Sequence, residues 1–228
     1  MVECLHAVFS ESNAMQTVAL ISQKGGAGKT TVALHLAVAF AATGRNTAVI
    51  DLDPQASAIN WADRREAELP VVISAHASRL QHEMRRAQDA GCQVLVLDTA
   101  PHSDRTALDA AKAADLILMP CRAAILDIEA VATTLDLVHT TGKPVYAVLN
   151  ATTPQGHEAR EAADALAELN VHTCPTWLGN RVAFARSLIS GQTAQEIEPK
   201  GKAAQEIAGL HTFVHAILHN ITQEGTQP

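Results

Sequence analysis

The stretch ISQKGGAGKTTVAL, residues 21–34, decides the fold of this chain. It begins inside an apolar run at 17–23 that has the composition of a buried strand, and it ends in a segment of helical character that starts near Lys29. Glycines dominate the residues between the two. A strand, a glycine-rich turn and a helix in this order form the setting in which a backbone loop wraps around an anion.

The residue types in the turn indicate that the anion is a phosphate chain. Glycine lets backbone N–H groups turn inward around phosphate oxygens, and the N-terminus of the helix adds about half a positive charge. Lys29 would reach the β- and γ-phosphates of a nucleotide, and the Thr30 hydroxyl would bind Mg²⁺. The glycines concerned are Gly25, Gly26 and Gly28.

The rest of the chain alternates apolar strands with helical segments. We expect strands at 17–23, 46–52, 93–98, 115–120 and 144–150, and helices at 29–43, 78–90, 104–113, 127–141 and 156–169. Glycine follows three of these helices, as expected for a left-handed stop, and 181–222 has helical patterns only. Strands that are apolar on both faces favour a parallel sheet. The sequence therefore predicts an α/β fold, a doubly wound and mostly parallel sheet with helices on both faces.

The pattern divides the chain into one domain and two short ends. We expect residues 1–14 to be a short extension, 15–222 to be a single domain and 223–228 to be a flexible tail. Met15, at the start of the first strand, is an alternative translation start.

Composition favours a well-packed cytoplasmic protein. The 228 residues are 47% hydrophobic and only 3% aromatic, so the core must consist mainly of aliphatic side chains and base stacking is not the expected way of holding nucleic acid. We see no signal peptide and no apolar run of membrane-spanning length. The four cysteines, without CxxC spacing, are expected to be buried or half-buried thiols rather than metal or disulfide partners: Cys4, Cys92, Cys121 and Cys174.

The net charge of −7 gives no indication of nucleic-acid binding. A local basic patch on an acidic protein can nevertheless bind nucleic acid by releasing the counterions of the phosphates. One candidate patch consists of Arg181, Arg186, Lys200 and Lys202, and another of Arg79, Arg85 and Arg86. Each patch taken alone is more typical of a solvated surface.

A second lysine distinguishes the loop from the plain consensus G-x-x-x-x-G-K-[ST]. The first consensus position is Gln23, and the loop reads KGGAGKT with Lys24 in front of the glycines. This resembles the deviant Walker A box of the ParA/MinD family of ATPases, whose members carry a signature lysine at the position of Lys24. The resemblance implies ATP or ADP with Mg²⁺ as ligands. It implies a phosphate site formed by Lys24, Gly25, Gly26, Ala27, Gly28, Lys29, Thr30 and Thr31.

In the family that the loop resembles, the signature lysine crosses to the nucleotide of a partner subunit. Because Lys29, Mg²⁺ and the amides already neutralise the subunit's own phosphates, we expect the flexible ammonium of Lys24 to reach outward from the rim of the loop. The resemblance thus implies a homodimer when ATP is bound, with Lys24, Lys29 and Asp53 as catalytic residues.

Two further strand ends agree with this resemblance. VIDLDPQ, residues 49–55, resembles the Walker A′ motif, in which Asp53 would orient the attacking water and Asp51 would lie near the Mg²⁺ shell. VLVLDTAP, residues 94–101, has the Walker B pattern, in which Asp98 would hold Mg²⁺. The carboxyl ends of such strands converge on one crevice.

The adenine would be bound at a third strand end. By resemblance, Asn150 hydrogen-bonds the base, and the loop near 175–181 forms the other wall. Alone, an asparagine at this position is more typical of a turn. The chain departs from the family at Ala100 and at CRAAILD, residues 121–127, where the family often has proline or serine.

Residues 180–207 look like the C-terminal part of small plasmid-partition ParA proteins that lack a helix-turn-helix domain. This resemblance implies a slow ATPase that binds non-specific DNA of the nucleoid as an ATP dimer. A ParB-like or ParG-like centromere-binding partner, together with DNA, would stimulate hydrolysis. The cargo would be a plasmid, a chromosome or another body.

Other readings remain open at this point. A MinD-like membrane-cycling ATPase would need a basic amphipathic tail, but no Lys or Arg follows Lys202, so we expect core packing and no stable membrane association. The apolar stripe consists of Ile207, Leu210, Val214, Ile217 or Leu218, and Ile221. A phosphotransferase on the same loop remains an alternative. The nitrogenase-iron-protein branch would need a cysteine just after Asp98, where none stands.

Three histidines share one face of the same helical segment at i, i+4 and i+8: His211, His215 and His219. They could bind a metal, but no carboxylate or cysteine accompanies them. We therefore expect them to form a solvated polar face opposite the apolar stripe.

Overall fold

The computed structural model describes residues 15–153 and 157–224. The predicted extension at 1–14 therefore lies outside the described residues, as do residues 225–228 of the predicted tail. The last helix continues to Glu224, two residues past the predicted end of the domain at 222.

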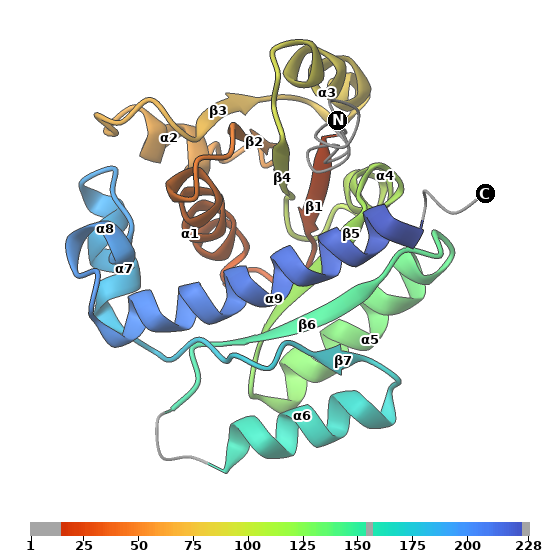
Figure 1. The fold of residues 1–228 in the computed structure, drawn as a ribbon. Helices are drawn as coiled ribbons and strands as arrows, with labels where there is room; N and C mark the ends of the chain where they lie inside the picture. The colour runs from red at the N-terminus through yellow and green to blue at the C-terminus, as the bar shows by residue number, and fades with distance from the viewer. Residues whose placement is uncertain (1–14, 154–156, 225–228) are drawn as a thin grey trace, which may run out of the picture.

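A seven-stranded sheet runs through the molecule in the order β3-β2-β4-β1-β5-β6-β7, and every strand pair is parallel (Figure 1). The strands are β1 (Gln16–Leu20), β2 (Thr47–Asp51), β3 (Val71–Ser74), β4 (Val94–Asp98), β5 (Leu116–Arg122), β6 (Val145–Asn150) and β7 (His172–Thr173). The doubly wound parallel sheet that the sequence predicts is confirmed. The strand order reverses on either side of β1, so the loop that follows β1 opens at the switch point of the sheet.

Helices cover both faces of the sheet. One face carries α1 (Lys29–Ala42), α2 (Ser57–Ala62), α7 (Val182–Ile189), α8 (Ala194–Ile197) and α9 (Lys202–Glu224). The other carries α3 (Leu80–Asp89), which continues the short 3₁₀ helix η1 (Ala77–Arg79), together with α4 (Asp104–Ala113), α5 (Ile125–His139) and α6 (Glu158–Glu168). The predicted glycine stops are confirmed, because Gly44, Gly91 and Gly142 all have positive φ.

Alternation along β1 divides the core into two layers. Val18 and Leu20 belong to the cluster under α1 and α9, whereas Ala19 and Ile21 belong to the cluster under α3–α6. All four side chains are fully buried. The continuous apolar runs in the sequence therefore correspond to strands that are covered on both faces.

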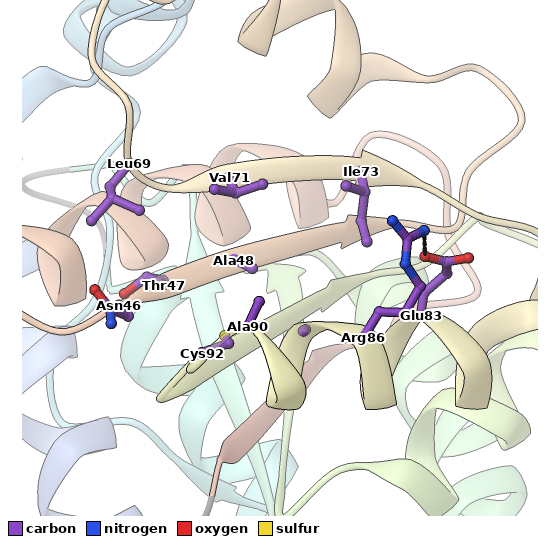
Figure 2. A pocket seen from close by; sticks show the side chains of 11 residues that line it. Asn46, Thr47, Ala48, Leu69, Val71, Ile73, Glu83, Arg86, Ala90 and Cys92 are labelled. Atoms are coloured by element: carbon purple, nitrogen blue, oxygen red, sulfur yellow. Dashed lines mark hydrogen bonds and ion pairs between the residues drawn. The ribbon is translucent and has the colours of Figure 1, made fainter.

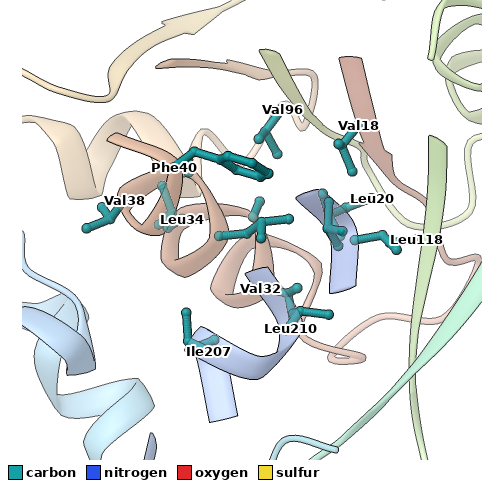
Figure 3. Close-up of a cluster of buried hydrophobic side chains, with 14 of the residues drawn as sticks. Val18, Leu20, Val32, Leu34, Val38, Phe40, Val96, Leu118, Ile207 and Leu210 are labelled. Carbon is teal, nitrogen blue, oxygen red and sulfur yellow. The ribbon is translucent and has the colours of Figure 1, made fainter. Parts of the chain in front are cut away.

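The apolar stripe near the C-terminus lies in this core. Ile207, Leu210, Val214 and Leu218 of α9 are at most 1% exposed, and Ile207 and Leu210 belong to the same buried cluster as Val32 and Leu34 of α1 (Figure 3). Core packing of the stripe is confirmed. Within the described parts of the chain, no helix is long and apolar enough to cross a membrane.

Three elements are absent from the prediction, and one predicted strand is shorter than expected. The sequence patterns missed α2 and the two edge strands, β3 and β7. These strands have four and two residues, and much of their surface is exposed, so neither carries the continuous apolar run of a central strand. Strand β1 ends at Leu20 instead of residue 23 because the chain turns there into the phosphate loop.

Candidate functional site

The loop between β1 and α1 has the backbone conformation of a phosphate-binding loop. Gly26 and Gly28 have φ values of +75° and +96°, which glycine adopts without strain. A Cβ at Gly28 would also collide with Nδ2 of Asn150. Helix α1 then begins at Lys29, so its free N–H groups border the loop. The strand, loop and helix that the sequence predicts are thus in place.

Lys29 lies behind the loop and is only 7% exposed. Its Nζ donates hydrogen bonds to the carbonyl oxygens of Ser22 and Lys24, at 3.1 and 3.4 Å. Burial lowers the pKa of Lys29, and the carboxylates of Asp98 and Asp53 oppose that effect. The structure therefore brings three of the predicted site residues within electrostatic range of one another.

Asp98, at the end of β4, has a carboxylate that is poorly satisfied by hydrogen bonds within the site. It is fully buried, and although the Thr30 hydroxyl lies near its carboxylate, neither oxygen has a well-formed hydrogen bond among the described residues. Burial raises its pKa from 3.8 to about 7, against the smaller lowering effects of the Thr30 hydroxyl and of Lys29. A buried carboxylate without partners is costly, and a cation would satisfy it.

Asp51 lies beside Asp98 in the register of β2 and β4, and its carboxylate organises the backbone that follows. Oδ1 accepts the N–H of Asp53 at 3.0 Å, and Oδ2 accepts the N–H of Ala58 and of Ile59 at 2.9 and 3.3 Å. These bonds fix the turn that carries Asp53 and the start of α2. The place of Asp51 in a magnesium shell stays a prediction, and its contacts show it as an anchor of the Asp53 turn.

Asp53 occupies the turn after β2 and is partly exposed. Its Oδ1 accepts the N–H of Gln55 at 2.9 Å, and its carbonyl accepts the N–H of Ala56 at 2.8 Å. The second carboxylate oxygen remains available for a water molecule, which is compatible with the predicted role.

Lys24 is held by its own chain. Its Nζ lies 2.6 Å from Oδ2 of Asp127, near the start of α5, and the Lys24 and Asp127 side chains are 36% and 6% exposed. We expected this ammonium to reach outward from the rim, but in the single chain it is bound to Asp127. The crossing to a partner's nucleotide stays a prediction, and it requires this ion pair to open.

Asn150, the last residue of β6, contacts the phosphate loop directly. Its Nδ2 donates to the carbonyl of Ala27 at 2.9 Å, and its Oδ1 accepts the N–H of Ala151 at 2.8 Å. The Thr152 N–H donates to Leu178 at 3.0 Å, which holds the segment 175–181 next to this strand end. A cavity of about 560 Å³ opens here between that segment and Thr152. Contact of Asn150 with adenine stays a prediction.

Sequence reasoning missed three residues that shape the site. Asp127 binds Lys24, the hydroxyl of Thr99 donates to the carbonyl of Leu20 at 2.8 Å, and Arg122 lies next to Gly26. The signal for Asp127 was an acidic residue in the first turn of a helix that follows a strand end. That for Arg122 was its position at the end of β5, within the stretch where the chain departs from the family pattern.

The predicted basic patches are partly engaged within the chain. The Arg181 guanidinium donates three hydrogen bonds to the carboxylate of Glu206, and Arg86 is paired with Glu83 at 2.9 Å. Arg79 lies 3.9 Å from the same Glu83 carboxylate. The remaining members are partly to fully exposed: Arg85, Arg186, Lys200 and Lys202.

A separate apolar cavity of about 350 Å³ lies between the β2–β3 edge of the sheet and α3 (Figure 2). Ala48, Val71 and Ile73 line it, and the Glu83–Arg86 pair lies at one end. None of the residues predicted for the phosphate site lines this cavity. Cys92 lies at its other end, and burial raises the pKa of this thiol.

The described cysteines are buried or half-buried free thiols, as predicted. Burial raises the pKa of both Cys121 and Cys174 to about 12, so these thiols are protonated at neutral pH. Cys4 lies outside the described residues.

The histidine face of α9 differs from the prediction. His211 packs edge-on against Phe40 with ring centroids 4.5 Å apart, and it stacks with His215 at 6.0 Å. Burial lowers the pKa of His211. The prediction of a solvated face is wrong for His211, because α9 lies close enough to α1 to cover it. In the described chain, no group of three acidic, histidine or cysteine side chains could hold a metal.

Comparison with known proteins gives three likenesses. A family model described as the CobQ/CobB/MinD/ParA nucleotide-binding domain matches residues 18–194. Maintenance of carboxysome distribution protein A of Gloeobacter kilaueensis is 33% identical over 198 residues, which cover 84% of this chain and 88% of that protein. Protein ParA of Rhizobium radiobacter is 27% identical over 221 residues, covering 92% and 99% of the two chains.

The fold is also that of a solved structure. The septum site-determining protein MinD of Pyrococcus horikoshii, in complex with Mg-ADP, superposes with a TM-score of 0.72 at 16% identity. The match covers 88% of this chain and 96% of that one. At this identity, the likeness concerns the fold alone.

Proposed function

Since the chain belongs to the CobQ/CobB/MinD/ParA family of nucleotide-binding proteins, we propose that it is a ParA-type positioning ATPase. It hydrolyses ATP to ADP and phosphate, dimerises when ATP is bound, and positions a plasmid, a chromosome or another cargo on the nucleoid. We place it in the cytoplasm on the same grounds.

The observation that carries the proposal is the environment of Lys29 and Asp98. A buried ammonium behind a glycine loop and a buried carboxylate without hydrogen bonds stand within electrostatic range of each other. The first supplies positive charge for phosphate oxygens. The second has buried oxygens that a bound cation would satisfy. This pair fits a Mg²⁺–nucleotide complex.

Mg²⁺ fits the residues present because it prefers a few oxygen ligands and keeps several waters. The oxygens of Asp98 and the hydroxyl of Thr30 would hold it, and it would neutralise charge between the β- and γ-phosphates when bound. The raised pKa of Asp98 describes the chain without that cation.

The chain's own residues would bind the phosphates, orient the attacking water and position the loop. The N–H groups of the loop and of the α1 N-terminus orient the phosphates, and Lys29 balances their charge. Asp53, held in place by Asp51, orients the attacking water. Asn150 fixes the loop at Ala27, next to the region where the base would lie.

ATP-dependent dimerisation would begin at the Lys24–Asp127 pair. Two apolar side chains beside Asp127, those of Ile125 and Leu126, are 69% and 64% exposed, which suits a face that is covered in an assembly. The proposed step transfers Lys24 from Asp127 to the γ-phosphate bound by the second subunit. Loss of that phosphate on hydrolysis returns Lys24 to Asp127 and opens the dimer.

DNA binding follows from dimerisation by avidity. Each subunit exposes three candidate cations: Arg186 on α7, Lys200 just before α9, and Lys202 at the start of α9. We exclude Arg181 from the primary contacts because Glu206 already binds it. Pairing two patches can raise binding greatly without new contacts. A centromere-binding protein of ParB or ParG type would then stimulate hydrolysis together with DNA.

Phosphate release with Mg²⁺-ATP, measured with and without double-stranded DNA, tests the proposal, and Lys29→Ala is the inactive control. We expect turnover in the wild type and none in Lys29→Ala.

Dimerisation is tested by light scattering, which should show a dimer with a non-hydrolysable ATP analogue and a monomer with ADP. Lys24→Ala should keep nucleotide binding but lose the dimer. DNA retention that is equal in ATP and ADP would contradict the switch.

A further inference from the structure

We propose that Arg122 is a phosphate-binding residue that this chain supplies to its own nucleotide, an inference that rests on the proposed ATPase function. The starting observation is its place over the phosphate loop. A Cβ built at Gly26 would lie 3.8 Å from Nη2 of Arg122, which is ordinary van der Waals contact. The guanidinium therefore lies directly against the loop backbone at a residue that has no side chain.

The guanidinium of Arg122 has no counter-charge among the residues that the structure describes. In this part of the chain its side chain makes no hydrogen bond and no ion pair, and the residue is exposed. Lys24, at the rim of the same loop, differs in this respect, because its ammonium is bound to Asp127. An arginine offers five N–H donors in a planar fork that matches phosphate oxygens. Its unmet donors point to an anionic ligand at the loop.

The position of Arg122 is fixed by the sheet rather than by a loop. It is the last residue of β5, which pairs with β1 on one side and with β6 on the other. In that register Arg122 lies opposite Asn150, which itself donates to Ala27 of the phosphate loop. Two neighbouring strand ends thus hold a guanidinium and an amide against successive parts of the loop. A group on such a frame is well placed to meet a ligand without rearrangement.

The ion pair between Lys24 and Asp127 makes the charge of Arg122 important for the reaction. While Lys24 is bound to Asp127, Lys29 is the one lysine of the loop that could neutralise the phosphates of a nucleotide bound to a single chain. Arg122 supplies a second positive charge in cis, before any partner arrives. An arginine supplied in cis stabilises charge that develops on transferring phosphate in other nucleotide hydrolases. We therefore infer that Arg122 contributes both to nucleotide affinity and to the basal rate.

Nucleotide affinity provides the test, measured by calorimetry with Mg²⁺ and either ADP or a slowly hydrolysed ATP analogue. Arg122→Ala should weaken binding of the ATP analogue by about ten- to a hundredfold, the range for a charge-assisted hydrogen bond. Arg122→Lys should fall between the wild type and Arg122→Ala, because it keeps the charge but loses the fork. Arg160→Ala, on the exposed surface of α6, is the matched control and should bind as the wild type does.

The thermal midpoint of the nucleotide-free protein separates recognition from structure. It should be the same for Arg122→Ala and the wild type, because the exposed guanidinium has no partner to lose. Wild type that binds neither nucleotide would overturn the proposed function. Wild type that binds while Arg122→Ala binds the analogue within twofold of it would overturn only the role of Arg122. A lysine variant no better than alanine would contradict recognition by charge.

Discussion

Asp98→Asn should stabilise the nucleotide-free protein and abolish the effect of Mg²⁺ on nucleotide affinity. Burial raises the pKa of Asp98 from 3.8 to about 7, so ionisation of this group opposes folding. A group whose folded pKa is raised stabilises the fold fully below its unfolded pKa and loses that contribution as pH rises through the folded pKa. The cost of the charge therefore appears between about pH 4 and pH 7. An amide at this position carries no charge to bury.

The magnitude follows from the difference in pKa. At 1.36 kcal/mol per unit, the cost of the Asp98 charge is about 2 kcal/mol at pH 5 and about 4 kcal/mol at pH 7. Burying the replacing amide offsets part of the gain. We expect the Asn variant to exceed the wild type by between about 2 and 4 kcal/mol at pH 7 and by little at pH 4.

Urea denaturation at pH 4, 5, 6 and 7, in buffer without Mg²⁺ or nucleotide, measures the free energy of unfolding for each variant. Asp136→Asn, an exposed carboxylate on α5, is the matched control and should stay within about 0.5 kcal/mol of the wild type. Affinity for a fluorescent ATP analogue, with and without Mg²⁺, is the second readout. An Asn variant that is no more stable at pH 7 than at pH 4, relative to the wild type, would refute the reasoning about the buried charge.

Three further predictions concern stability. Lys24→Ala should lower the free energy of unfolding, measured by denaturation, by about 1–2 kcal/mol. Asp127→Asn should lower it less, because only the first change leaves a buried carboxylate without its partner. Equal losses for the two variants would contradict this. Burial lowers the pKa of His35 to about 4, so its contribution is complete above pH 6.5 and is lost as pH falls through 4. In the Asp98→Asn background, unfolding free energy should fall by about 3 kcal/mol over that range, and His35→Gln should flatten the profile. Leu210→Ala should cost about 2–5 kcal/mol by denaturation, and a loss below 1 kcal/mol would place α9 outside the core.

The family relationship constrains the mechanism but leaves the cargo open. Proteins named for carboxysome distribution and for ParA both resemble this chain along most of its length. The parallel sheet with helices on both faces is the part of this likeness that the solved structures also show.

The sequence by itself determined the phosphate loop and the parallel sheet around it. Both are local properties: glycine is needed where φ is positive, and a strand covered on both faces is apolar along its whole length. Asp53 and Asp98 could be placed for the same reason, because the carboxyl ends of parallel strands meet at one edge. The stripe on α9 also followed from helical periodicity alone.

Only the tertiary structure decided which groups are engaged within the chain. Lys24 and Asp127 are 103 residues apart, and Asn150 and Ala27 are 123 residues apart, so no local pattern links either pair. Arg122 faces Gly26 only because β5 is a neighbour of β1 in the strand order. Short edge strands and the cover over His211 depend likewise on what packs nearby. Periodicity in the sequence indicates which side of an element is buried, whereas contacts between distant elements depend on the order of the strands in the sheet.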